Sequence, residues 1–425
     1  MRRLFAILAV LVFGLSAALP ARAAEKKMDM TECYEHALAR SEQVAISDQE
    51  IARAQAIYTQ ALGSVLPKLS INVQEILQDS SSQSDGAGQV GSTFTQFSRP
   101  SVAVTLTQPI FKGFKEFRAL KLAKVNESQK RLLKRNAERL LFQDVAIVFL
   151  TIVKIERDIE IFQKILQVER RSVAELKERV RLGKSRDSEA ALLETDIALN
   201  EAELERKRGE RQIAYDTLAF LTGLNPQPQI DYGSPPVRDL KPLPEYTAMV
   251  EARPDVQAAR DAVQLARGEV KIRQGDLLPQ ADVTANYYPY RAGFQRDIKW
   301  DATFNVGIPV FNWETVGQIR EAKTLAKQAQ LQEELTRRSA GTEVQKSYDG
   351  YVSSRNQFKK FQSAADKARN SYGLQAQDFR DSLINTIDLL QSQQTWLDAL
   401  RQRNTAEVQT WLDWLALQVT AGAMP

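Results

Sequence analysis

The sequence contains an internal duplication, and this feature constrains the fold more than any other. Residues 101–111 read SVAVTLTQPIF, and residues 301–311, two hundred positions later, read DATFNVGIPVF. Each run alternates apolar and polar residues, ends in proline, an aliphatic residue and phenylalanine, and precedes a long helical stretch. Gly183 corresponds in the same way to Ser382. One unit is therefore written twice, and we expect it to be helix, strand, strand, very long helix, turn and long helix.

The first 23 residues have the pattern of a secretory signal peptide. Two arginines follow Met1, an apolar run covers residues 4–19, and Ala21 and Ala23 give a small-residue cleavage site. Cleavage is expected after Ala23, with Ala24 as the alternative. The apolar run is shorter than the roughly 20 residues that span a bilayer, which argues against a retained anchor. The mature chain is therefore expected to begin at residue 24, outside the inner membrane.

Charge and cysteine content exclude several classes of function. Removing residues 1–23 removes three arginines, so the formal charge falls from +4 to +1. Lysine and arginine alternate with acids along predicted helices and form no nucleic-acid patch. Cys33 is the only cysteine and His36 the only histidine. We expect Cys33 to be a core residue and His36 a surface or interface residue, and we predict no metal, no cofactor and no enzymatic activity.

Four short segments alternate strictly between apolar and polar residues. In 69–74 the odd positions are apolar, and the corresponding segment 281–287 keeps this phase. In 101–107 and 301–308 the even positions are apolar. Such alternation is typical of transmembrane β-strands, which have one face in lipid and the other in a wet lumen. A soluble sheet with one buried face gives the same pattern and stays open as an alternative.

The residues between the paired strands predict two hairpin loops, 79–98 and 289–299. Both loops are polar, and the first is rich in serine, glycine and glutamine. Tyr287, Tyr288, Tyr290 and Trp300 cluster at this end of the second hairpin, as expected of an interfacial aromatic girdle. Two hairpins cannot close a barrel, and an open sheet in lipid leaves unpaired edges. Further copies of the same chain are the simplest completion.

The helical segments are unusually long. Residues 113–182 contain no proline and no internal glycine, and apolar residues recur along them at heptad spacing. A helix of about 70 residues is roughly 105 Å long. We expect a second long helix over about 316–380, shorter partners over 184–222 and 383–420, and helices over 31–63 and 246–275 stacked end to end with those partners. Leu383, Ile387, Leu390 and Leu397 are expected to form the apolar stripe of the last helix.

The region 224–245 contains six prolines and reads as a stiff linker across the outside of the helical cylinder. The predicted organisation is a signal peptide (1–23), a first repeat (24–223), this linker, and a second repeat (246–425). Because neither half closes a barrel or buries its helical faces alone, we expect the repeats to form one structural domain.

In the order and duplicated spacing of several short motifs, the mature chain resembles the TolC-like outer-membrane efflux proteins of Gram-negative bacteria. The motifs are Leu-Pro at 66–67 and 278–279, QPIF at 108–111, IPVF at 308–311, LGKS at 182–185 and LTG at 221–223. This resemblance implies a homotrimer with a twelve-stranded barrel in the outer membrane and a long α-helical barrel in the periplasm. It also implies a passive exit duct that docks to a periplasmic adaptor and an inner-membrane pump.

The resemblance places the gate and the adaptor contacts at the periplasmic tips, where each long helix turns into its shorter partner. It implies adaptor contacts at Leu182, Gly183, Lys184, Ser185, Asp381, Ser382 and Leu383. Glu189 and Asp388 lie six residues beyond Gly183 and Ser382, and rings of such acids in a trimer would favour cations. Gln391 stands where family members commonly have a further aspartate, which implies a weaker cation block.

The gate acids, the second tip and the function of the chain each have an alternative interpretation. Glu189 and Asp388 lie in the first turn of their helices, where the helix dipole stabilises acidic side chains, so they need have no role in a gate. Ser382 stands where the family usually has glycine, so the geometry of the second tip is open. The competing function is a soluble periplasmic coiled-coil scaffold whose strands form a small capping sheet.

Overall fold

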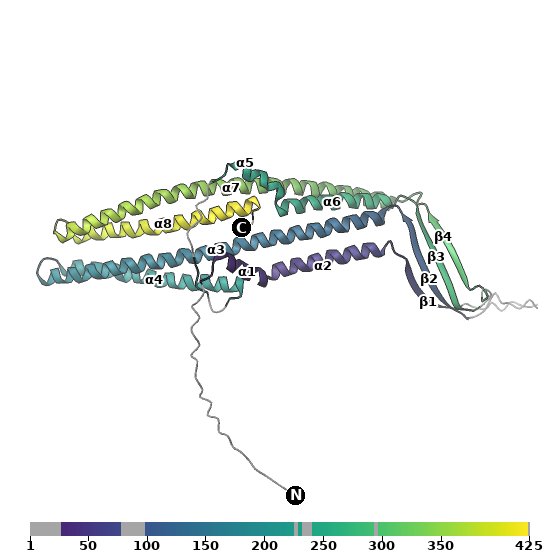
Figure 1. Cartoon of the computed structure of the whole chain (residues 1–425), viewed down its shortest axis with the longest axis horizontal. Coiled ribbons are helices and arrows are strands. Elements are labelled where there is room, and N and C mark those ends of the chain that lie inside the picture. The colour runs from purple at the N-terminus through teal and green to yellow at the C-terminus, as the bar shows by residue number, and fades with distance from the viewer. Residues whose placement is uncertain (1–26, 78–97, 225–227, 232–239, 293–295, 424–425) are drawn as a thin grey trace, which may run out of the picture.

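Two very long helices form the length of the molecule. The computed structural model describes residues 27–77, 98–224, 228–231, 240–292 and 296–423. Helices α3 (Lys115–Arg181) and α7 (Trp313–Arg380) contain 67 and 68 residues, and each runs from the sheet to the opposite end (Figure 1). Each is roughly 100 Å long. The predicted signal peptide, and residues 79–97 of the first predicted loop, lie outside the described residues.

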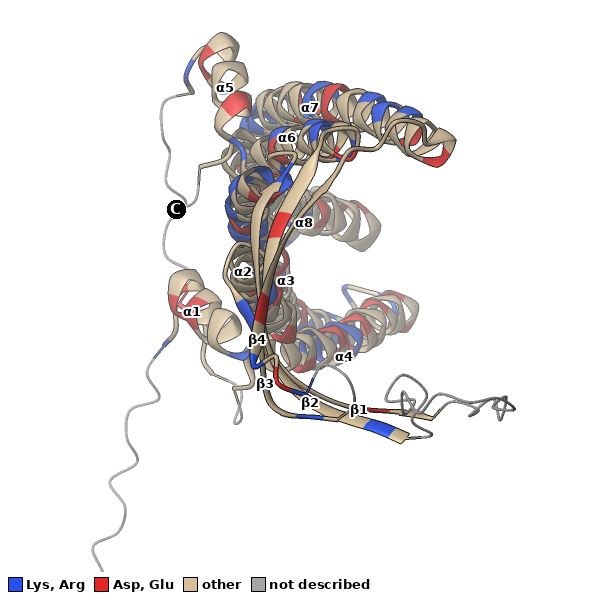
Figure 2. Ribbon diagram, turned by 90° about the vertical axis from the view of Figure 1, so that its right-hand side faces the viewer, with Lys and Arg blue, Asp and Glu red and all other residues tan. Residues whose placement is uncertain are grey.

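Shorter helices complete the bundle in the predicted manner. At the end far from the sheet, α4 (Asp187–Thr222) packs on α3, and α8 (Thr386–Ala421) packs on α7. Near the sheet their places are taken by α2 (Glu42–Gly63) and α6 (Pro254–Gly275). The two shorter helices of the second repeat, α6 and α8, also pack on α3. The helices therefore form a curved layer, which Figure 2 shows end-on. Within the described ranges, none of the helices combines the length and apolarity needed to cross a membrane.

The first helix of each unit is broken, whereas the sequence predicted one continuous helix in each. Helix α1 (Met30–Arg40) ends at Ser41, whose hydroxyl accepts a hydrogen bond from the Val44 backbone N–H and so caps α2. In the second unit, α5 (Leu243–Met249) and a short 3₁₀ turn (Val250–Ala252) precede α6. Pro254 opens α6 and disfavours helical backbone at the residue before it. Helices α1 and α5 therefore lie on the convex side of the curved layer (Figure 2).

The four strands form one antiparallel sheet in the order β1-β2-β3-β4. They are β1 (Lys68–Leu77), β2 (Ser98–Lys112), β3 (Gln280–Arg291) and β4 (Trp300–Gly307). The two hairpins join through β2 and β3, and β1 and β4 each have one free edge among the described residues. Strand β4 ends at Gly307, short of the predicted end. It has a neighbour on one side only, whereas β2 is paired on both sides and continues past Pro109.

The sheet separates apolar from polar residues as the alternation predicted. Leu69, Ile71 and Val73 of β1 are 70–78% exposed and share a face with their register partners on β2. On the opposite face, a row of hydrogen bonds crosses all four strands. Asn72 donates to Thr105 (3.0 Å), Thr105 donates to Asn286 (2.8 Å), and Asn286 donates to Asp301 (2.8 Å). One face therefore suits an apolar medium and the other suits water.

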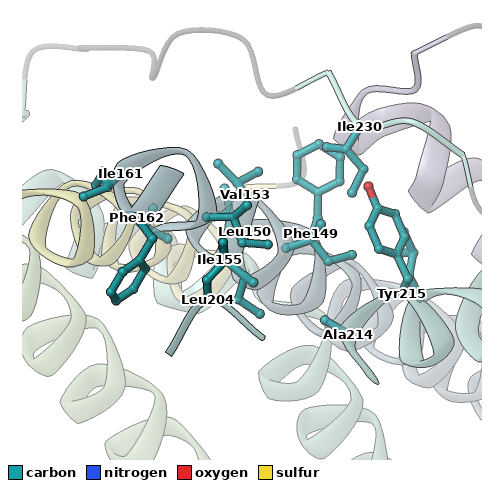
Figure 3. Packing of buried hydrophobic residues seen from close by; sticks show 14 of the residues in the cluster. Phe149, Leu150, Val153, Ile155, Ile161, Phe162, Leu204, Ala214, Tyr215 and Ile230 are labelled. Carbon is teal, nitrogen blue, oxygen red and sulfur yellow. The ribbon is translucent and has the colours of Figure 1, made fainter. Parts of the chain in front are cut away.

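The core follows the predicted heptad stripe of α3. Six of its eight residues are buried, and the other two, Leu141 and Val148, pack against the same cluster. The six buried residues are Val145, Ile152, Ile155, Ile159, Phe162 and Leu166. Figure 3 shows Phe162 and Ile155 near Leu204, and Phe149 near Ile230. Ile230 comes from the linker and pairs in parallel with Met28. A fully buried side chain of this size stabilises the fold by about 1.5–3 kcal/mol, so this cluster fixes the helices, the N-terminal segment and the linker together.

The stripe predicted for α8 is only half correct. Leu390 and Leu397 are buried, but Leu383 and Ile387 are 73% and 62% exposed. Both lie at the extreme tip, beyond the last layer of the bundle that could cover them. That layer is the tip cluster, which joins all four helices at this end: Val173, Leu176, Ala190, Leu193, Phe379, Leu389 and Leu390.

Candidate functional site

The two tip turns have the same backbone structure. At the end of α3, Gly183 N–H donates to Val180 C=O (2.9 Å) and Lys184 N–H donates to Arg179 C=O (2.8 Å). At the end of α7, Ser382 N–H donates to Phe379 C=O (3.1 Å) and Leu383 N–H donates to Asp378 C=O (2.8 Å). This pair of bonds is the Schellman motif. The duplicated turns are therefore equivalent, although glycine is replaced by serine in the second.

Ser382 adopts the left-handed conformation that glycine normally provides. Its φ is 62°, close to the 71° of Gly183. For a residue with a Cβ atom this conformation costs about 1–2 kcal/mol. The serine therefore leaves the turn geometry intact and stores strain at the second tip.

Replacing this serine is expected to release the strain. Ser382→Gly should raise the free energy of unfolding by about 1 kcal/mol, because glycine reaches positive φ without a steric cost. The reciprocal change, Gly183→Ser, should lower it by a similar amount, since nothing lies within 4 Å of the Cβ position at Gly183. Thermal unfolding followed by circular dichroism measures both. Equal stability of Ser382→Gly and the parent would contradict the strain.

The predicted gate residues lie just beyond these turns. Asn385 caps α8 by accepting a hydrogen bond from the Asp388 backbone N–H (3.0 Å). Asp388 and Gln391 are exposed, and both line a cavity of about 440 Å³ between α7 and α8. Asp378 of α7 lines the same cavity, so a second acid, which the sequence reasoning missed, accompanies Asp388.

Glu189 has a partner that the sequence did not suggest. Thr386, the first residue of α8, donates its hydroxyl hydrogen bond to Glu189 Oε2 at 2.7 Å. Thr386 occupies the repeat position of Asp187, so this contact depends on a difference between the two copies. Arg179 of α3 forms a second connection by donating to the Arg380 carbonyl (2.8 Å) with its guanidinium over the Phe379 ring. The two tips are thus tied together within one chain.

The predicted adaptor-contact residues lie on an accessible surface. Gly183, Lys184, Asp381 and Ser382 are exposed, and Ser185 is half-buried. Leu182 is 56% exposed and, like Leu383 and Ile387, has no apolar cover within the described chain. Three exposed aliphatic side chains thus lie at this end of the molecule, among polar residues of the two turns.

The aromatic residues at the far end of the sheet divide between its faces. Tyr287 pairs in register with Trp300, and Tyr290 with Val102, so these three lie on the apolar face and are largely exposed. Tyr288 instead hydrogen-bonds Asp301 on the polar face and lies under the Arg291 guanidinium. A girdle on the apolar face would therefore contain Tyr287, Tyr290 and Trp300 without Tyr288.

Cys33 and His36 lie where the sequence predicted. Cys33 is fully buried in the main core cluster, and burial raises the pKa of its thiol to about 11. His36 lies on the exposed side of α1. In the parts of the chain that the structure describes, no group of three or more His, Cys, Asp or Glu residues could hold a metal ion.

Comparisons with known proteins agree with this architecture. The family model "Outer membrane efflux protein" matches residues 33–224 and 246–423. No curated protein sequence gives a significant match. Among solved structures, CusC superposes with a TM-score of 0.82 at 14% identity, covering 93% of this chain and 92% of its own. The outer membrane protein VceC of Vibrio cholerae superposes with a TM-score of 0.79 at 18% identity, covering 93% and 96%. The open-state MtrE channel of Neisseria gonorrhoeae gives 0.76 at 16%, covering 93% and 89%.

Proposed function

The chain belongs to the outer membrane efflux protein family, channels of the Gram-negative outer membrane that extend into the periplasm, and from this premise we propose that three copies form its working exit duct. The duct passively conducts substrates that a periplasmic adaptor and an inner-membrane pump deliver. One observation carries the assembly: the four-stranded sheet has an exposed apolar face, and in the described part of the chain its two outer edges are unpaired. In lipid, each backbone N–H or C=O group left unpaired at such an edge costs several kcal/mol. Pairing β4 with β1 of the next copy satisfies these groups.

The helices support the same assembly. Along α4, Leu192, Leu199, Ile213 and Phe220 are exposed at multiples of seven residues, which is a coiled-coil seam that no described part of the protomer covers. Helix α4 lies at one margin of the curved layer and α7 at the other (Figure 2). At the level of α4, helix α7 exposes Leu374, whereas its exposed Leu325, Leu331 and Leu335 lie nearer the sheet, at the level of α6. In a closed ring of three, the α4 margin of one copy packs on the α7 margin of the next.

We further propose that both repeats act as one structural domain, with residues 1–23 removed on export. The β2–β3 pairing and the packing of α3 on α6 and α8 support this, because each joins the first repeat to the second. The soluble scaffold is not favoured, because family membership indicates an outer-membrane channel and the β1 apolar face is open to its surroundings.

The tips are proposed to dock the adaptor. Leu182, Leu383 and Ile387 supply apolar contact area, and the surrounding polar residues of the two turns supply hydrogen bonds. The two equivalent Schellman turns would present six similar tips in a trimer. An adaptor with a repeated contact surface could therefore engage both repeats in the same way.

The proposed function is tested with the detergent-purified mature protein in a planar bilayer, with its oligomeric mass determined in the same preparation. Discrete openings from a trimer would support the duct. A protein that stays monomeric and soluble and never inserts would overturn it. The two readouts are independent, so a trimer without conductance would retain the assembly and remove the open channel.

The proposed gate acids give a separate expected outcome. Glu189→Ala combined with Asp388→Ala should raise single-channel conductance or reduce cation preference, because rings of carboxylates at a narrow end attract cations and obstruct anions. Thr386→Val is the matched control, since it removes the Glu189 hydrogen bond and keeps both charges. Unchanged conductance and selectivity in the double variant would exclude these two residues from the gate.

A further inference from the structure

A buried carboxylate connects the two repeats one helical turn before the tip cluster. Glu169 of α3 is 0% exposed and accepts a hydrogen bond from Asn200 Nδ2 of α4 at 2.7 Å. Gln393 of α8, 1% exposed, lies close enough to act on the same carboxylate. Neither Glu169 Oε2 nor either polar atom of Gln393 has a partner at ordinary hydrogen-bond geometry within the described residues. Three helices therefore meet at an incompletely satisfied polar site.

The groups around this carboxylate do not balance its charge. From α4, Asp196 and Glu201 face it and oppose its ionisation, and Glu201 is itself paired with Arg170 at the surface. From α7, Tyr372 interacts electrostatically with Glu169, and the contribution of α8 is the neutral Gln393 amide. Burial, partly offset by the Asn200 hydrogen bond, raises the pKa of Glu169 from 4.5 to about 7. The group thus changes charge near neutral pH, where ordinary glutamates are ionised.

We propose that Glu169 is a proton-operated latch, which packs the tip hairpins together when protonated and loosens them when ionised. When protonated, the carboxyl is neutral and Asn200 still donates to Oε1, so no charge is buried where α3 and α4 meet α8. The three helices then pack without the cost of a buried charge. When ionised, the carboxylate is a buried charge without a cation, and separation of the helices, or entry of water, relieves that cost.

The position of the latch connects it to the tips. Val173 follows Glu169 by one turn on α3, and Leu389 and Leu390 precede Gln393 by one turn on α8. All three belong to the tip cluster, which is the last apolar layer before the turns. Loosening at Glu169 therefore weakens the layer that holds the two hairpins together. The step from loosened hairpins to a wider channel rests on the proposed function, whereas the protonation and the packing do not.

The direction of the pH effect follows from the raised pKa. Below about pH 4.5 the group is protonated in both packed and loosened states and has no effect on the balance. Between pH 4.5 and about 7 the loosened state loses its proton first, so packing weakens as the pH rises. Above pH 7 both states are ionised and the effect is constant. The full change corresponds to roughly 300-fold in the opening equilibrium.

The test compares the parent with Glu169→Gln, which imitates the protonated side chain, in the intact detergent-solubilised protein. Amide hydrogen exchange in 193–200 and 389–397 should be faster in the parent, and the parent-to-variant ratio should rise up to roughly 300-fold between pH 4.5 and 7. Glu160→Gln, an exposed change on the same helix, is the matched control and should behave as the parent. A ratio independent of pH would overturn the latch.

Two further measurements separate titration from packing and from gating. Infrared difference spectra of the parent and Glu169→Gln should show a protonated carboxyl that titrates near pH 7. Gln393→Leu should move that midpoint upward, because the amide lowers the pKa of Glu169; an unmoved midpoint would exclude Gln393 from the latch.

In bilayers, conductance should rise with pH in the parent and not in Glu169→Gln. If exchange responds and conductance does not, the latch holds packing only and its link to the gate is wrong, while a protein that forms no channel at all fails the proposed function instead.

Discussion

A lysine on the apolar face of the sheet is expected to prevent assembly in the outer membrane. Ile71 of β1 is 70% exposed and Phe304 of β4 is 65% exposed. Ile71→Lys and Phe304→Lys therefore each place a charge on the open apolar face. On the lipid face of a barrel such a charge costs about 2–4 kcal/mol near the bilayer midplane. The outer-membrane fraction of the double variant should therefore contain no heat-modifiable trimer. Membrane fractionation and unheated gel electrophoresis measure this loss.

The opposite face provides the matched control. Ser70 and Thr303 neighbour the two substituted residues along their strands and point to the polar face, where Thr303 pairs in register with Thr284. Ser70→Lys with Thr303→Lys adds the same charges on the same strands, but in the proposed wet lumen. Normal trimer yield is expected for this pair. If both double variants assemble equally well, the apolar face does not meet lipid, and the soluble sheet becomes the better interpretation.

The second large effect is expected at Gly113, where β2 passes into α3. Gly113 has a φ of +67°, and a Cβ atom there would stand 2.2 Å from the Gly275 carbonyl oxygen at the end of α6. Gly113→Ala therefore adds a backbone clash to the left-handed strain. We expect a loss of about 3 kcal/mol or more in the free energy of unfolding, because the strain alone costs about 1–2 kcal/mol. Thermal unfolding in detergent and outer-membrane yield measure the loss.

Gly183 separates the two causes. Its φ is +71°, nearly that of Gly113, yet nothing lies within 4 Å of the position where its Cβ would stand. Gly183→Ala should therefore show the conformational cost of about 1–2 kcal/mol without the clash. Equal losses in the two alanine variants would mean that the first repeat does not approach the second at Gly113 and Gly275, and that the close packing of the two strand-to-helix junctions is wrong.

The elements that sequence alone predicted well are those with a periodic signal. The heptad stripe of α3 and the alternation in β1 repeat often enough that no other packing satisfies them. The breaks after α1 and before α6 were missed, because Ser41 and Arg253 interrupt apolar patterns that continue on both sides. Local capping by Ser41 and the restriction before Pro254 decided these breaks. The exposure of Ile387 was missed because a stripe does not show where its partner helices end.

For the candidate site, the duplication located both tips, since the same offset aligns Gly183 with Ser382 and Glu189 with Asp388. It could not show that Thr386 binds Glu189, because that contact joins residues from different copies. The same limit applies to Glu169, which looks like one more solvated acid in a charged helix. Only the approach of Asn200 and Gln393 from two other helices distinguishes it.

The repeating unit, its element types and the two faces of each strand can be predicted without coordinates, because these depend on periodicities within one segment of chain. Three features emerge only from the folded chain: which β-strands pair between the repeats, the glycine-like conformation of Ser382, and which acids are exposed at the tip and which are buried. These features depend on contacts between segments that are far apart in the chain, such as those that carry Glu169 and Gln393. Burial and charge at such contacts are set by the packed neighbours, and no local pattern records which neighbours those are.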